Sequence, residues 1–71
     1  MQAWDYKVVE IYNEVKMGTV NWRWEEDGQK LPGNPDMFKK AKELGQEGWE
    51  LVSVTTYGAP IHYVYWFKRP K

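Results

Sequence analysis

The sequence predicts an α+β domain in which a small antiparallel β-sheet carries one helix packed on one face. Two observations support this fold class: several segments alternate at period two, as strands do, and one segment between them has helical spacing. The predicted order of elements is β-β-α-β-β. With 71 residues, the chain is expected to form a single domain, residues 1–71.

The first two strands are predicted at residues 3–12 and 19–25. Residues 3–12 alternate from side to side and are rich in β-branched and aromatic types, whereas residues 13–18 form a polar break with a glycine. In residues 19–25 the alternation returns, with Trp22 and Trp24 on one side of the strand. The two strands are therefore expected to pair as a hairpin.

A helix is predicted after a loop at residues 26–34. Asn34 is a suitable N-cap, since its side chain can accept a hydrogen bond from an unpaired backbone N–H, and Pro35 suits the first helical position because it lacks that donor. The expected apolar face consists of Phe38, Ala41 and Leu44. Gly45 and Gly48 offer left-handed residues that can end the helix.

Two further strands are predicted after the helix, at residues 49–57 and 61–69. Both have strand composition, and the turn residues Gly58, Ala59 and Pro60 lie between them. These strands are expected to form a second hairpin.

The faces of the predicted sheet indicate a partner. Neither side of the last strands is polar, although an antiparallel strand with one solvated face normally alternates cleanly. One helix can shield only one face, and a short chain gains stability from oligomerisation. We therefore expect a homo-oligomer, most simply a two-fold dimer packed sheet on sheet; the alternative is that residues 13–35 fold back as a lid. The expected interface residues are Tyr63, Tyr65, Trp66 and Phe67.

Composition argues against several function classes. Ten Lys and Arg balance ten Asp and Glu, whereas a duplex-binding protein normally carries a basic excess. There is no cysteine and one histidine, His62, so thiol chemistry, a two-histidine metal site, a cofactor and an enzymatic role are not expected. The longest uncharged stretch, residues 51–67, is too short and too polar to span a membrane, and we expect a cytoplasmic protein.

Three motifs give the chain a resemblance to a known family. They are W-D-Y-K-V-V-E at residues 4–10, L-G-Q-E-G-W-E-L-V-S-V at 44–54 and F-K-R-P at 67–70, together about a third of the chain. In this order they resemble the domain of unknown function 4177 family, small proteins of bacteria, archaea and phages. The resemblance implies a small α+β fold and no activity, because none is assigned to the family. Residues 13–35 depart from the family pattern, which has a shorter connection there.

The function predicted from these residues is non-catalytic binding by a homo-oligomer. A nucleotide-like anionic ligand requires aromatic plates and one or two cations, and a sequestering protein of the kind that phages encode follows this plan. The expected ligand-binding residues are Trp22, Arg23, Trp24, His62, Lys68 and Arg69. Two alternatives stay open: a protein–protein interaction or accessory module, and a binder of single-stranded nucleic acid whose aromatics stack on unpaired bases.

Overall fold

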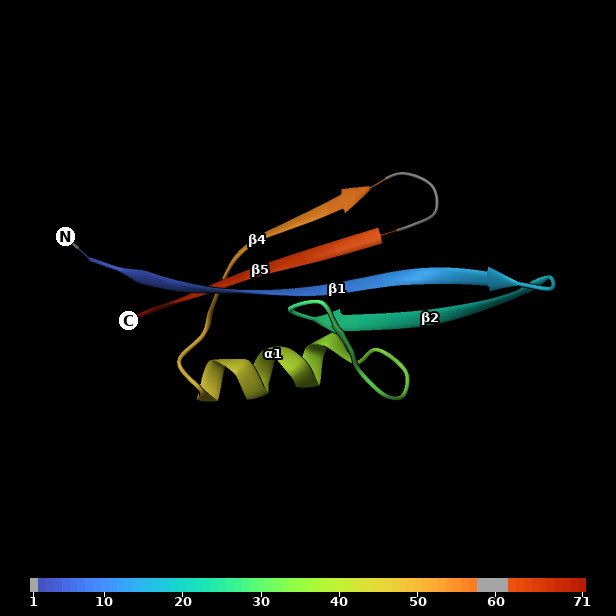
Figure 1. Ribbon diagram of the computed structural model, residues 1–71. Coiled ribbons are helices and arrows are strands. Elements are labelled where there is room, and N and C mark those ends of the chain that lie inside the picture. Colours follow the sequence, from blue (N-terminus) through green and yellow to red (C-terminus); the bar gives the residue numbers. More distant parts are fainter. Residues whose placement is uncertain (1, 58–61) are drawn as a thin grey trace.

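The computed structural model describes residues 2–57 and 62–71, which form a five-stranded antiparallel sheet and one helix (Figure 1). The elements are β1 (Trp4–Lys16), β2 (Thr19–Glu26), β3 (Gln29–Lys30), α1 (Met37–Gln46), β4 (Glu50–Tyr57) and β5 (His62–Pro70). The α+β class is confirmed, but the order is β-β-β-α-β-β, because β3 occupies part of the loop expected at 26–34. The turn expected at Gly58, Ala59 and Pro60 and the strand start expected at Ile61 lie outside the described residues.

The strands lie in the order β3-β2-β1-β5-β4, and each neighbouring pair is antiparallel. β1 is central and pairs with both β2 and β5, so the two predicted strand pairs, β1–β2 and β4–β5, are confirmed. Trp4 lies opposite Pro70, which brings the first and last strands side by side with the two chain ends at one end of the sheet (Figure 1).

The β1–β2 hairpin is longer than predicted. The polar break expected at residues 13–18 is wrong: β1 continues to Lys16, and Met17 and Gly18 alone form the turn. Both have positive φ, 51° and 79°, as a two-residue hairpin turn requires. Residues 15–20 are exposed, so polar side chains cost nothing in this part of the ribbon and do not interrupt it. We call residues 13–22 the arm.

The helix begins later than predicted. Asp36, not Asn34, is the N-cap, and its side-chain carboxylate accepts a hydrogen bond from the backbone N–H of Lys39 (3.1 Å). Pro35 therefore precedes the cap instead of occupying the first helical position. Asparagine and aspartate both suit a cap, so the sequence offers two starts and the structure uses the second. No helix in the described part of the chain is long and apolar enough to cross a membrane.

The buried face of α1 centres on Leu44. Phe38, which the sequence placed on this face, is 75% exposed, whereas Met37 packs against the core. Met37 and Leu44 are seven residues apart and share a face, while Phe38 lies about 100° further round the helix. The helix ends in a turn in which Trp49 N donates to Leu44 O (2.9 Å) and Gly48 adopts a φ of 89°.

The core lies between α1 and one face of the sheet, which we call the helix-side face. Val9 of β1, Leu44 of α1 and Phe67 of β5 form its centre and are at most 1% exposed. The partly buried side chains packed around them are Trp24, Met37, Trp49 and Tyr65. Full burial of each of these three side chains contributes about 1.5–3 kcal/mol to the stability of the fold, so the core is small.

No described helix lies on the other face of the sheet, which we call the open face (Figure 1). Register places Lys68 beside Tyr6, Trp66 beside Val8 and His62 beside Tyr12 on this face. The prediction that the helix shields one face is therefore confirmed. The lid alternative is wrong, because the strands within residues 13–35 extend the sheet instead of crossing it.

The helix face can be tested by a matched pair of substitutions. Leu44→Ala is expected to lower the free energy of unfolding by about 2–5 kcal/mol, because it leaves a cavity at a fully buried site. Phe38→Ala, in the same helix, is expected to change it by less than about 0.5 kcal/mol, because its ring is exposed. Urea unfolding followed by tryptophan fluorescence measures both, and similar losses for the two variants would contradict the observed helix face.

Candidate functional site

The six predicted ligand-binding residues do not form one site. Cross-strand register divides them between the two faces of the sheet, because neighbouring residues of a strand point in opposite directions. Those on the helix-side face are Trp22, Trp24 and Arg69, and those on the open face are Arg23, His62 and Lys68.

Two of the predicted cations are engaged within their own chain. The ammonium of Lys68 lies 4.2 Å from the ring centroid of Trp4. Arg69 stacks over the ring of Trp49 at 4.3 Å, and its guanidinium donates a hydrogen bond to the carbonyl of Glu47 (2.8 Å), at the end of α1. Arg69 therefore fastens β5 to the helix-to-strand turn, which is a role in the fold.

The four predicted interface residues also divide between the faces. Phe67 is in the core, and Tyr63 and Tyr65 share its side of β5. Trp66 lies on the open face, where it is 39% exposed. Strand alternation therefore prevents these four side chains from forming one continuous surface, and Phe67 is not accessible to a partner.

His62 belongs to a bonded cluster on the open face. Its Nε2 lies 3.0 Å from the Glu10 carboxylate, and its ring is flanked by Tyr12 and Tyr57 at 5.7 and 5.5 Å between centroids. The Tyr12 hydroxyl donates to Glu25 (2.7 Å), which, with burial, raises the pKa of Tyr12 to about 12. The cluster joins β1, β2, β4 and β5 and holds its polar groups in mutual contacts.

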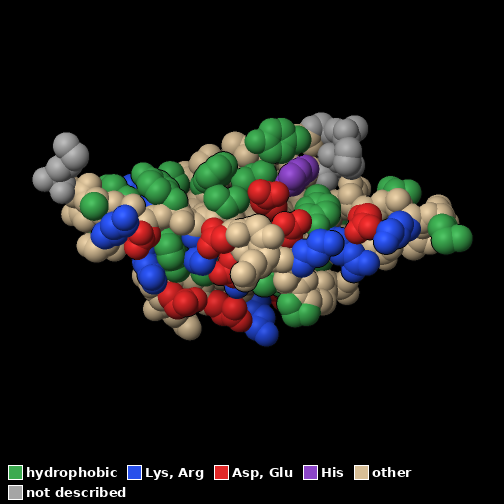
Figure 2. Space-filling view, in the orientation of Figure 1, with side chains coloured by type: hydrophobic (Ala, Val, Ile, Leu, Met, Phe, Trp, Pro, Cys, Tyr) green, Lys and Arg blue, Asp and Glu red, His purple; other side chains and the backbone are tan. Residues whose placement is uncertain are grey.

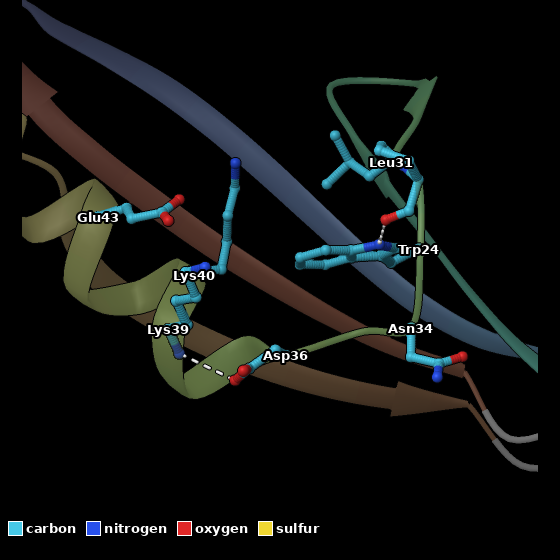
Figure 3. Close-up of a pocket in the computed structure, with 8 residues that line it drawn as sticks. Trp24, Leu31, Asn34, Asp36, Lys39, Lys40 and Glu43 are labelled. Carbon is cyan, nitrogen blue, oxygen red and sulfur yellow. Dashed lines mark hydrogen bonds between the residues drawn. The ribbon is translucent and has the colours of Figure 1, made fainter.

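Trp24 lines two hollows beside β2. Its Nε1 donates to the carbonyl of Pro32 (3.1 Å), so the loop after β3 fixes the ring. The hollow toward the helix has a volume of about 410 Å³ (Figure 3). The residues that line it are Trp24, Leu31, Pro32, Asn34, Asp36, Lys39, Lys40 and Glu43. Two lysines here face two carboxylates, so the hollow has no excess of charge.

The second hollow has a volume of about 300 Å³ and an excess of positive charge. Lys16, Arg23 and Lys30 line it together with one carboxylate, Glu14, and with Trp24. Its remaining lining consists of Leu31, Pro32 and Gly33. In Figure 2, Lys and Arg side chains gather over the part of the molecule where Figure 1 draws β2, with carboxylates among them. We call this second hollow the basic hollow.

The cations of the basic hollow are weakly held by their own chain. Lys16 Nζ and Arg23 Nε each lie 3.5 Å from an oxygen of Glu14, and both side chains are at least half exposed. The positive field of Lys16, followed by its hydrogen bond and that of Arg23, holds the pKa of Glu14 below its ordinary value. One shared carboxylate cannot neutralise three cations, so the hollow can attract an anion.

Residue types in the sequence point to Arg23 and Trp24, but not to Lys16 and Lys30. Lys16 was assigned to a polar break, and Lys30 to a loop. The extension of β1 brings Lys16 to the same edge as Arg23. The pairing of Lys30 in β3 with Glu25 in β2 brings Lys30 there as well. The signal that could have found Lys16 is its spacing from Glu14, which places both on one face of a continuous strand.

A separate charged cluster joins the sheet to the helix. Lys7 Nζ lies 2.9 Å from Glu26 and 3.0 Å from Asp27, and Lys40 of α1 also pairs with Glu26. The second oxygen of Asp27 accepts a hydrogen bond from Val8 N (2.9 Å). These contacts satisfy the cluster internally, so it is a structural clamp and does not supply a cation for a ligand.

Comparison of the chain with protein-family models, with curated proteins and with solved structures finds no match. The resemblance to the domain of unknown function 4177 family therefore stays a prediction, and the function must be argued from the geometry.

The charged clamp predicts acid sensitivity. Burial alone would raise the pKa of Glu26 and Asp27, but hydrogen bonds from Lys40 and Lys7 to Glu26, and from Val8 N and Lys7 to Asp27, outweigh burial and lower both pKa values. A lowered folded-state pKa stabilises the fold above the unfolded-state pKa, and this contribution is lost as pH falls through the folded value. The free energy of unfolding is therefore expected to decrease below about pH 5.

Asp27→Asn should flatten this decrease and reduce stability at pH 7, while keeping a residue that tolerates the observed φ of 50°. Glu47→Gln, at an exposed carboxylate, is the control and should retain the wild-type slope. Chemical denaturation at several pH values measures the slopes, and the same acid dependence in Asp27→Asn and wild type would contradict the clamp.

Proposed function

We propose that the chain is a non-catalytic binding module that acts as a homo-oligomer and holds a phosphate-bearing, nucleotide-like ligand. The observation that carries the proposal is the basic hollow, a cavity lined by three cations, one carboxylate and Trp24. The balanced hollow toward the helix lacks this excess of charge.

The residues of the basic hollow suit a phosphate group. Arg23 presents a planar fork of donors that matches two phosphate oxygens, while Lys16 and Lys30 act as point charges on either side. Trp24 also lines the hollow, and an indole can stack on a base in a way that tolerates different bases. A ligand that carries both groups would use the whole hollow, whereas inorganic phosphate would use only the cations.

Exposed apolar side chains support the homo-oligomer. β4 is exposed along its whole length, and its Leu51, Val52 and Val54 side chains are 46%, 52% and 46% exposed. Contiguous apolar surface on a small protein usually marks an interface. The formal net charge of zero gives two copies no long-range repulsion.

The ligand proposal is tested by titration with ADP. We expect ADP to bind, and Arg23→Ala to raise its Kd at least about tenfold, because a charge-assisted hydrogen bond is lost. Lys42→Ala is the matched control: it removes one positive charge from the exposed surface of α1, and it should leave Kd unchanged. Isothermal titration calorimetry gives Kd and stoichiometry, and tryptophan fluorescence reports contact with Trp24.

Adenosine provides the second control, because it has the base without the phosphates. Its binding should be weaker than that of ADP, and the affinity for ADP should fall with added salt. Equal affinity for adenosine and ADP, or an unchanged Kd in Arg23→Ala, would overturn the assignment of the basic hollow.

A further inference from the structure

The two edges of the sheet are unequal. At one edge, β3 has two residues, and the chain just after it still lies beside β2, since Leu31 N donates to Trp24 O (3.0 Å). At the other edge, β4 has eight residues and β5 is its only strand neighbour among the described residues. An edge strand of this length presents a row of unpaired backbone N–H and C=O groups.

Beyond its first residues, β4 lacks the features by which proteins normally protect an edge. Residues 51–57 contain no charge and no proline, and all eight residues of the strand are exposed. The register shift between Leu51 and Ser53 is an irregularity that disturbs only the beginning of the strand. Beyond it, residues 53–57 pair with β5 in regular register. Their outward backbone groups are therefore regularly spaced for pairing with another strand.

We infer that β4 pairs antiparallel with β4 of a second copy of this chain, so that two sheets join edge to edge. The inference rests on the homo-oligomer of the proposed function and specifies its interface. A two-fold axis at Thr55 places Thr55 opposite its equivalent, Val54 opposite Thr56 and Ser53 opposite Tyr57. Threonine pairs and aromatic or β-branched pairs are favourable cross-strand neighbours.

The charge pattern of β4 favours a second copy as its occupant. The single charge of the strand, Glu50, lies at its first residue, and its cross-strand neighbour in the same chain is Lys68. Antiparallel pairing about the middle of the strand carries the two Glu50 side chains to opposite ends of the new ladder. No like charges then face one another, and each partner supplies the same uncharged, β-branched surface.

The open face is less suited to join two copies. Val64, at its centre, is already buried by neighbours in its own chain. Glu10 lies opposite Val64 and contacts His62. Glu25 lies opposite Glu10 on the next strand and accepts a hydrogen bond from Tyr12. Packing two such faces together would bury carboxylates without new partners, which is costly. Pairing two copies at the β4 edge does not bury these carboxylates.

Like-charge substitution at the proposed axis provides the test. Thr55→Lys should place two lysines directly opposite and raise the dimer dissociation constant about tenfold or more, and Thr55→Glu should do the same. Mixing the two variants should restore the dimer, because opposite charges then meet. Tyr6→Lys, on the open face, is the control and should leave the dimer intact. Native mass spectrometry measures mass, and circular dichroism checks that each variant is folded.

Each outcome decides the inference. Loss of the dimer in both Thr55 variants with recovery on mixing supports the edge pairing. A dimer that survives both Thr55 substitutions overturns it, and one lost in Tyr6→Lys instead shows sheet-on-sheet packing, which leaves the homo-oligomer standing. A wild-type monomer at concentrations up to about 1 mM overturns both the edge pairing and the homo-oligomer. Ligand binding is measured separately by the ADP titration.

Discussion

A helix shorter than the sheet it covers is the constraint on which the rest of the structure depends. α1 has ten residues and spans about 15 Å, whereas the central strand β1 has thirteen and spans about 43 Å. The helix therefore reaches only the part of the sheet around Val9 and Phe67, where Leu44 completes the core. The arm, the open face and β4 remain outside its cover, and the basic hollow and the β4 edge lie in or beside these regions.

Much of the fold could be predicted because it depends on local patterns. Period-two alternation located four of the five described strands, and Leu44 was placed correctly on the buried face of the helix. The errors arose where a pattern allowed two readings. The polar residues within 13–18 are typical of a break, although an exposed hairpin tolerates them. Helical spacing alone places Phe38 on the apolar face with Leu44, whereas Met37 is the residue that packs against the core. Which interpretation is correct depends on the elements that pack against each segment, and the sequence of one segment does not specify them.

The candidate site was harder to predict because it depends on which strands become neighbours. Arg23 and Trp24 were found from their residue types, but Lys16 and Lys30 reach them only through the long β1–β2 pairing and the short β3. Conversely, Arg69 has the right chemistry for an anion but is engaged by Trp49 and the Glu47 carbonyl. Residue type shows what a side chain can bind, whereas topology determines whether an internal partner already occupies it.

Sheet order relates the two proposals to one another. The basic hollow lies at the β3–β2 edge and the proposed dimer seam at β4, so the proposed ligand binding and the proposed self-association would use opposite edges of the same sheet. Seven strand spacings separate β2 from β2 of the second copy in the joined sheet, which is about 34 Å. This distance exceeds the Debye length of about 8 Å at physiological ionic strength, so an anion in one hollow does not repel an anion in the other. Two copies joined in this way carry two independent sites, each built by one chain, instead of one ligand held between subunits.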